Sequence, residues 1–261
     1  MKVQFVPLLQ IQRDLYRIPR GVERFRAYLE TMVNSDGTDV RLPPLVAMNP
    51  MAKDHVPTLL DALLALDAEA VAAQATAQAK DNLADAPGDF QLGLVVADDL
   101  MGGWTNRYAS EFSGLFEGHL AYKRGWLSAV LWSSEIPKAQ TVREAVMTTI
   151  FRTAYVLQHG PALTLRDMLA REGHVMAMAG CSEPSLDPAD LDYTREVLKP
   201  LLKSTDQPTL IACLFGDSAA RALGYPPQGL SQRAGLALAL NEARQGISRA
   251  EAQPAAPTRE L

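Results

Sequence analysis

The clearest structural signal in the sequence is Phe90-Gln91-Leu92-Gly93-Leu94-Val95-Val96-Ala97-Asp98-Asp99. It is an almost continuous apolar run that follows a turn signal at Pro87-Gly88 and ends at two carboxylates. A run of this length without polar alternation predicts a strand that is buried on both faces, as strands of parallel sheets are.

Helical patterns and further short apolar runs flank this strand. Downstream, large apolar residues recur every three or four positions over 104–120, which predicts a helix, and residues 126–132 form a second strand candidate. Upstream, residues 45–48 form a third strand candidate, followed by a leucine-rich segment over 56–66. Strands separated by helix-length crossovers indicate an α/β fold: three layers, with a mostly parallel sheet of about four or five strands flanked by helices.

The C-terminal third is richer in helical patterns than in strand patterns. We expect one α/β domain over residues 1–247, within which 161–247 could form a helical subdomain, and a flexible tail over 248–261 that carries Pro254 and Pro257.

Composition excludes several classes of protein. The 261 residues include 25 Lys and Arg against 30 Asp and Glu, a formal net charge of -5, which argues against a nucleic-acid or membrane-surface partner. No apolar run approaches the ~20 residues of a membrane span, and the N-terminal residues lack a signal-peptide core. Cys181 and Cys213 show no metal-binding or redox spacing, which fits reduced thiols. We expect a cytoplasmic protein.

The carboxyl ends of parallel strands are where ligands bind in open α/β sheets. Each of the three strand candidates is followed by polar residues that this rule would bring to one edge. They are Asn49, Lys53 and His55 after the first, Asp98 and Asp99 after the second, and Ser133, Ser134 and Glu135 after the third.

The loop between Asp98 and Arg107 joins the strongest strand to the strongest helix. Its adjacent Gly102 and Gly103 permit close backbone approach, and the first turn of the following helix offers backbone N–H groups to an anion, with Arg107 as a bidentate clamp. Trp104 either lines this site or packs in the core. The loop matches neither a dinucleotide fingerprint nor a Walker A loop. The alternative is a tight turn with a capped helix and two solvated acids.

Three groups are candidates for the chemistry itself. Asp98 and Asp99 either bind a divalent ion, for which their hard oxygens favour Mg²⁺, or act as acid and base. His55 is a candidate general base or anion clamp, unless Asp54 simply caps a helix there. Glu111, four residues after Arg107, either pairs with it on the surface or forms a wall of the site.

The sequence therefore predicts an enzyme that acts on a small phosphate- or carboxylate-bearing metabolite at the carboxyl edge of the sheet, with Mg²⁺ as an optional cofactor. Hydrolysis, lyase and transfer chemistry all fit. The alternative is a non-catalytic ligand-binding protein or a homo-oligomeric assembly protein. The expected partners are a small molecule and, in the second case, further copies of this chain.

Overall fold

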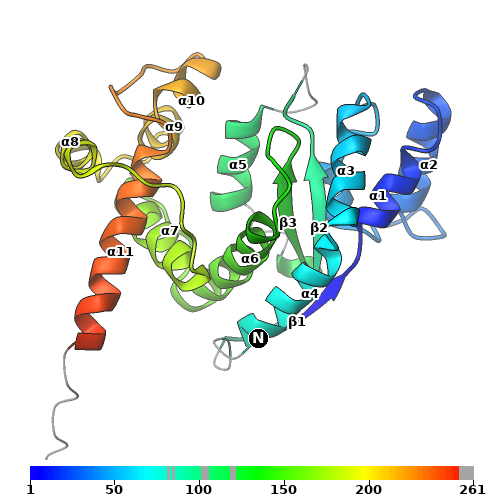
Figure 1. The fold of residues 1–261 in the computed structure, drawn as a ribbon, viewed down its shortest axis with the longest axis horizontal. Coiled ribbons are helices and arrows are strands. Elements are labelled where there is room, and N and C mark those ends of the chain that lie inside the picture. Colours follow the sequence, from blue (N-terminus) through cyan, green and yellow to red (C-terminus); the bar gives the residue numbers. More distant parts are fainter. Residues whose placement is uncertain (81–82, 84–85, 101–105, 118–121, 253–261) are drawn as a thin grey trace, which may run out of the picture. The chain divides into compact units, whose positions relative to one another are not determined.

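The computed structural model describes residues 1–80, 83, 86–100, 106–117 and 122–252 (Figure 1). It divides into two compact units, residues 1–161 and 162–261. In chain order the elements are β1 (Lys2–Val6), α1 (Leu9–Leu15), α2 (Val22–Met32), the 3-10 helix η1 (Pro43–Ala47), α3 (His55–Ala65), α4 (Ala68–Ala79), β2 (Asp89–Ala97), α5 (Arg107–Phe116), β3 (Trp126–Trp132), α6 (Ala139–His159), α7 (Leu165–Ala179), α8 (Pro188–Leu198), the 3-10 helix η4 (Lys199–Leu201), α9 (Gln207–Phe215), α10 (Asp217–Ala222) and α11 (Ala234–Ala252).

The first unit holds a parallel sheet in the order β1-β2-β3. The central strand β2 is buried from Leu92 to Ala97, which confirms the parallel, doubly buried strand predicted there. Helix α6 contacts β3, α4 contacts β1 and α6, and η1 contacts β2 and β3. The chain is thus a mixed helical and parallel-sheet protein, with three strands among the described residues rather than four or five.

Two strand predictions differ from the structure. Residues 45–48 do not form a strand: Pro43 and Pro44 instead start η1, because proline has no N–H to donate to a sheet ladder but fits a first helical turn. The third strand is β1, whose alternation of exposed Lys2 and buried Val3 is that of a sheet edge, with a lysine of the kind that discourages further strand pairing.

Gln12 completes the sheet where β1 stops. The pairing of β1 with β2 ends at Gly93, three residues before Val96. The side-chain amide of Gln12, fully buried, donates to the Val96 carbonyl at 2.7 Å and accepts from the Val96 N–H at 2.9 Å. One side chain therefore satisfies both backbone groups that a longer β1 would have paired.

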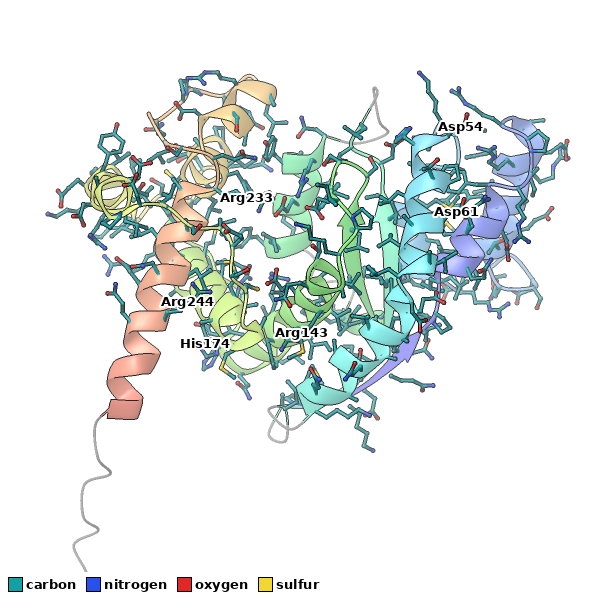
Figure 2. The ribbon with its side chains drawn as sticks, in the orientation of Figure 1. Asp54, Asp61, Arg143, His174, Arg233 and Arg244 are labelled. Atoms are coloured by element: carbon teal, nitrogen blue, oxygen red, sulfur yellow. The ribbon has the colours of Figure 1, made fainter. Side chains whose placement is uncertain are left out.

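Helix α1 also carries an ion pair on the outside of this unit. Arg13 Nε lies 2.6 Å from the Oδ1 atom of Asp61, which sits on the exposed side of α3 (Figure 2). The Asp61 side chain is 57% exposed, so this pair contributes little to stability.

The regular elements of the second unit are all helices among its described residues. A capping box joins Thr164 and Asp167 at the start of α7, as their spacing predicts. Gly173 of α7 packs so closely against α11 that an added Cβ would lie 2.4 Å from the Ala239 carbonyl oxygen. Helix α11 continues to Ala252, through the first part of the predicted tail, and 253–261 lie outside the described residues. No helix in the described part of the chain is long and apolar enough to cross a membrane.

Candidate functional site

The carboxyl edge of the sheet brings together residues that are far apart in the sequence. Asp98 is buried there and accepts hydrogen bonds from Asn49 Nδ2 at 2.8 Å, His55 Nε2 at 2.7 Å and Ser133 Oγ at 3.0 Å. We call Asn49, His55, Asp98 and Ser133 the Asp98 group. Its members come from the loop before α3, the start of α3, the end of β2 and the end of β3.

The hydrogen bonds of the Asp98 group fix its charge. Burial opposes ionisation of Asp98, but the bonds from His55, Asn49 and Ser133 outweigh it and lower the pKa of this carboxyl below its usual value. An ionised carboxylate only accepts hydrogen bonds, so His55 Nε2 carries the proton in this pair.

His55 Nδ1 is the unsatisfied atom of the group. It is buried and has no hydrogen-bond partner among the described residues. With the proton on Nε2, neutral His55 presents a lone pair at Nδ1, oriented by the carboxylate behind it. This arrangement suits a general base or an acceptor for a ligand proton.

A second group forms around Arg107, which begins α5. Arg107 donates to Ser134 Oγ at 3.0 Å and lies 3.5 Å from Asp99 Oδ2 and 3.6 Å from Glu111 Oε2. It also donates to Glu135 Oε1, and its guanidinium carbon lies 5.3 Å from the centre of a ring of Trp132. We call Asp99, Arg107, Glu111, Ser134 and Glu135 the Arg107 group.

The two groups meet at one hydroxyl. Ser133 Oγ lies 3.0 Å from both Asp98 Oδ1 and Asp99 Oδ1, and it also accepts the Asp99 N–H. The consecutive carboxylates turn apart, Asp98 toward α3 and Asp99 toward Arg107. Strand geometry favours this divergence, since successive side chains point to opposite faces.

The metal prediction gains no support from this geometry. All four carboxylate oxygens of Asp98 and Asp99 accept hydrogen bonds from protein groups. Within the described ranges, no group of three or more His, Cys, Asp or Glu residues could hold a metal ion. Binding of Mg²⁺ would have to displace several of the present donors.

The predicted anion site at the start of α5 is altered. Gly102, Gly103 and Trp104 lie outside the described residues. Helix α5 starts at Arg107, and the side chain of Asn106 accepts from the N–H groups of Tyr108 and Ala109, two of the donors expected to hold an anion. Arg107 itself is surrounded by three carboxylates.

Of the remaining predicted residues, some belong to the two groups and one does not. Asn49, Ser133 and Glu135 join the two groups, as expected from the strand-end rule, although Asn49 follows a 3-10 helix rather than a strand. Lys53 is exposed and, within the described part of the chain, bonds to neither group.

Tyr16, which follows α1, and Arg24 of α2 hold the loop that carries Asn49 and leads to His55, and the sequence did not single them out. The Tyr16 hydroxyl donates to the Asn49 carbonyl at 2.6 Å, and burial, with the charge of Asp98, raises the pKa of that phenol. Arg24 is buried, donates to the carbonyls of Ile18, Pro50 and Ala52, and lies over the Tyr16 ring. The available signal was Arg24 itself, four residues before Tyr28 and therefore beside the apolar face of α2.

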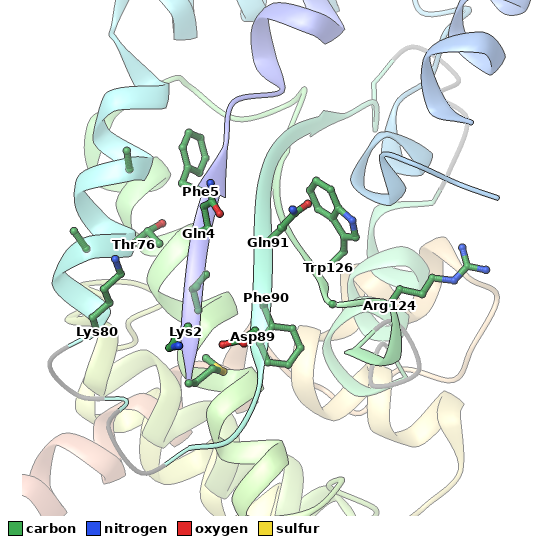
Figure 3. A pocket seen from close by; sticks show the side chains of 15 residues that line it. Lys2, Gln4, Phe5, Thr76, Lys80, Asp89, Phe90, Gln91, Arg124 and Trp126 are labelled. Atoms are coloured by element: carbon green, nitrogen blue, oxygen red, sulfur yellow. The ribbon is translucent and has the colours of Figure 1, made fainter. Parts of the chain in front are cut away.

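The described residues also form hollows near the sheet. A cavity of about 300 Å³ adjoins the Arg107 group, with Glu111 and Trp132 in its wall. A larger open groove of about 1110 Å³ runs along β1 and the amino ends of β2 and β3, among Lys2, Lys80 and Arg124 (Figure 3). We place the site at the carboxyl edge despite the size of the groove, because loops and polar groups converge at that edge.

Comparisons of the chain with protein-family models, with curated proteins and with solved structures found no match.

Proposed function

We propose that the chain is an enzyme that acts on a small metabolite at the carboxyl edge of its sheet, with His55 and Asp98 as the acid–base pair. The observation that carries this proposal is His55 itself, whose Nε2 is held by a buried carboxylate while its buried Nδ1 has no partner among the residues that the structure describes. Oriented His–carboxylate pairs at strand ends serve general acid–base catalysis.

The proposed substrate carries a phosphate or carboxylate group that binds Arg107. Glu135 is the most exposed of the three carboxylates around this guanidinium, at 31% against 5% for Asp99 and 16% for Glu111. An incoming anion would therefore displace Glu135 at the lowest desolvation cost. In this proposal Glu135 occupies Arg107 until the substrate arrives.

Thermal-shift measurements with inorganic phosphate and a panel of small phosphate esters and carboxylates test this proposal. Binding should raise the Tm of the wild type, and Glu135→Gln should bind the same anion more tightly because its competitor is weakened. Arg107→Gln should lose the response. A panel in which neither wild type nor Glu135→Gln responds to any anion would refute the anionic substrate.

A second candidate is a non-catalytic ligand-binding protein. The cavity of about 300 Å³ favours it, because Arg107 and not His55 adjoins this cavity through Glu111 and Trp132. A ligand found in the thermal-shift panel separates the two candidates: turnover that His55→Gln abolishes supports the enzyme, whereas binding without turnover supports the binding protein.

The finer parts of the sequence prediction remain proposals. They are the three-layer arrangement, the cytoplasmic location, assistance by Mg²⁺ and homo-oligomerisation. Adding Mg²⁺ to the thermal-shift panel tests the metal, with Asp99→Asn as the variant that should remove any response.

A further inference from the structure

The hydroxyl of Ser133 lies between two carboxylates but has one proton to donate. Its Oγ atom is 3.0 Å from Asp98 Oδ1 and 3.0 Å from Asp99 Oδ1, and it accepts the Asp99 N–H at 3.0 Å. A serine hydroxyl has a single O–H donor, whose direction is set by rotation about the C–O bond. The hydrogen bonds to Asp98 and to Asp99 are therefore alternatives, and Ser133 makes one of them at a time.

The charge of Arg107 decides which carboxylate receives this proton. The Arg107 guanidinium lies 3.5 Å from Asp99 Oδ2, and Ser134 donates both its N–H, at 2.9 Å, and its hydroxyl, at 2.6 Å, to the same carboxylate. Asp98 accepts from Asn49 and from neutral His55, neither of which carries a charge. With Asp99 compensated by a cation, Asp98 is the more negative acceptor, and Ser133 donates to it.

An anion bound to Arg107 would reverse this preference. The anion competes with Asp99 for the same guanidinium, so the charge of Asp99 becomes less compensated and attracts the hydroxyl of Ser133 more strongly. The O–H group then turns from Asp98 Oδ1 to Asp99 Oδ1. The proton stays on Ser133 Oγ and no covalent bond breaks, but Asp98 loses one of its donors.

This loss acts on His55 because both donors use the same oxygen atom. His55 Nε2 lies 2.7 Å from Asp98 Oδ1, the atom that Ser133 also contacts. Donors that share one acceptor weaken each other, so the bond from Nε2 strengthens when Ser133 turns away. A stronger bond at Nε2 places more negative charge on the imidazole ring and makes Nδ1 a better proton acceptor.

We infer that Ser133 is a positioning residue that couples the charge of Arg107 to the strength of His55 as a base, through the rotation of one hydroxyl. The inference rests on the proposed function, since it takes Arg107 as the anion site and His55 as the base. It adds an order of events: the substrate anion binds first, and its binding activates His55. Without the anion, Ser133 stays on Asp98 and His55 is the weaker base.

A double-mutant cycle measures the coupling without a ligand. Arg107→Gln removes the charge that compensates Asp99, and NMR of the labelled full-length protein at pH 8 follows the ¹H shift of the His55 Nε2–H group. The shift should move downfield in Arg107→Gln, because the bond to Asp98 strengthens. In the Ser133→Ala background the same substitution should have roughly half the effect or less, since only the direct influence of the lost charge remains.

Two neighbouring positions provide matched variants. Ser134→Ala also removes a hydroxyl from Asp99, but Ser134 makes no hydrogen bond to Asp98 among the described residues, so this background should keep the full response to Arg107→Gln. Ser133→Thr retains the hydroxyl and should keep it as well. Asp99→Asn removes the competing charge, so it should reduce the response as Ser133→Ala does, and it tests the coupling even where Ser133→Ala does not fold.

An equal response in the wild-type, Ser133→Ala and Asp99→Asn backgrounds would overturn the inference. Inorganic phosphate should move the Nε2–H resonance in the same direction as Arg107→Gln does, and phosphate that binds at Arg107 without moving it would overturn the inference too. The two proposals fail separately. A protein that binds no anion refutes the anionic substrate whatever the cycle shows, whereas an equal response in all backgrounds refutes the role of Ser133 and leaves the anion site in place.

Discussion

Replacing Asp98 with asparagine tests whether the Asp98 group is held together by a charge. Asparagine keeps the volume but has one acceptor oxygen. If that oxygen replaces Asp98 Oδ1 and keeps the bonds from His55 and Ser133, the new NH₂ faces the NH₂ of Asn49. Asn49 is not expected to turn its oxygen inward, because that oxygen already accepts the Met51 N–H at 3.0 Å.

The magnitude follows from these contacts. Two buried donors left without a partner cost about 1–3 kcal/mol each, and two bonds that lose their charged acceptor weaken by about 1 kcal/mol each. We therefore expect Asp98→Asn to lower the free energy of unfolding by about 4–8 kcal/mol at neutral pH. Asp61→Asn is the control, because Asp61 is 57% exposed in its pair with Arg13, and its loss should stay within about 1 kcal/mol.

Urea unfolding followed by tryptophan fluorescence reports on the first compact unit, which contains Asp98, because Trp104, Trp126 and Trp132 all belong to residues 1–161. The folded pKa of Asp98 is lowered, so its stabilisation is complete above the unfolded value of about 3.9 and is lost as pH falls through the folded pKa. The difference between wild type and Asp98→Asn should thus be constant from neutral pH to about pH 5 and shrink below about pH 4. A loss no larger than that of Asp61→Asn, or a difference that persists unchanged in acid, would show that the charge of Asp98 does not hold this group together.

Three further changes test other parts of the structure. Gln12→Leu leaves the buried N–H and C=O of Val96 without partners and should lower the free energy of unfolding by about 2–6 kcal/mol. Hydrogen exchange of the Val96 amide should become faster. Exchange as slow as in the wild type would contradict the role of Gln12. Gly173→Ala places a Cβ 2.4 Å from the Ala239 carbonyl oxygen and should destabilise the second unit by about 1–3 kcal/mol, measured by calorimetry. Gly114→Ala is also a helical substitution but faces open space, so it should stabilise the first unit by up to about 1 kcal/mol. Burial raises the pKa of Cys213 to about 12, so a maleimide reagent should leave this thiol unmodified at pH 8 until the protein is unfolded; rapid modification of the native protein would show that the α9 packing opens.

The central strand and the meeting of strand-end residues could be predicted because both follow from local apolar patterning and from the geometry of parallel sheets. Asp98, His55 and Ser133 needed no motif to be found. The edge strand β1 was missed because a short segment with exposed Lys2 and Gln4 carries a weak periodic signal. The prolines of η1 were visible, but the apolar run around them outweighed them in the strand prediction.

Apart from the i,i+4 pair of Arg107 and Glu111, the pairing within the site was beyond a sequence argument. Arg107 was expected either to hold an anionic ligand or to pair with Glu111, and the structure shows the Glu111 pair together with contacts to Asp99, Ser134 and Glu135 that the spacing did not predict. Spacing identifies which residues reach an edge, but the partner of each depends on how loops turn. Tyr16 and Arg24 act on the site through backbone carbonyls, which every residue possesses and no pattern distinguishes.

The contact between Gln12 and Val96 fixes the length of the chain between β1 and α1. Only Pro7 and Leu8 connect Val6 to the start of α1, and each residue inserted within the helix before Gln12 would rotate that side chain by about 100° away from the strand. Single-residue insertions or deletions there should thus be far more damaging than substitutions at Pro7. The length of this connection is therefore constrained by the reach of one amide side chain.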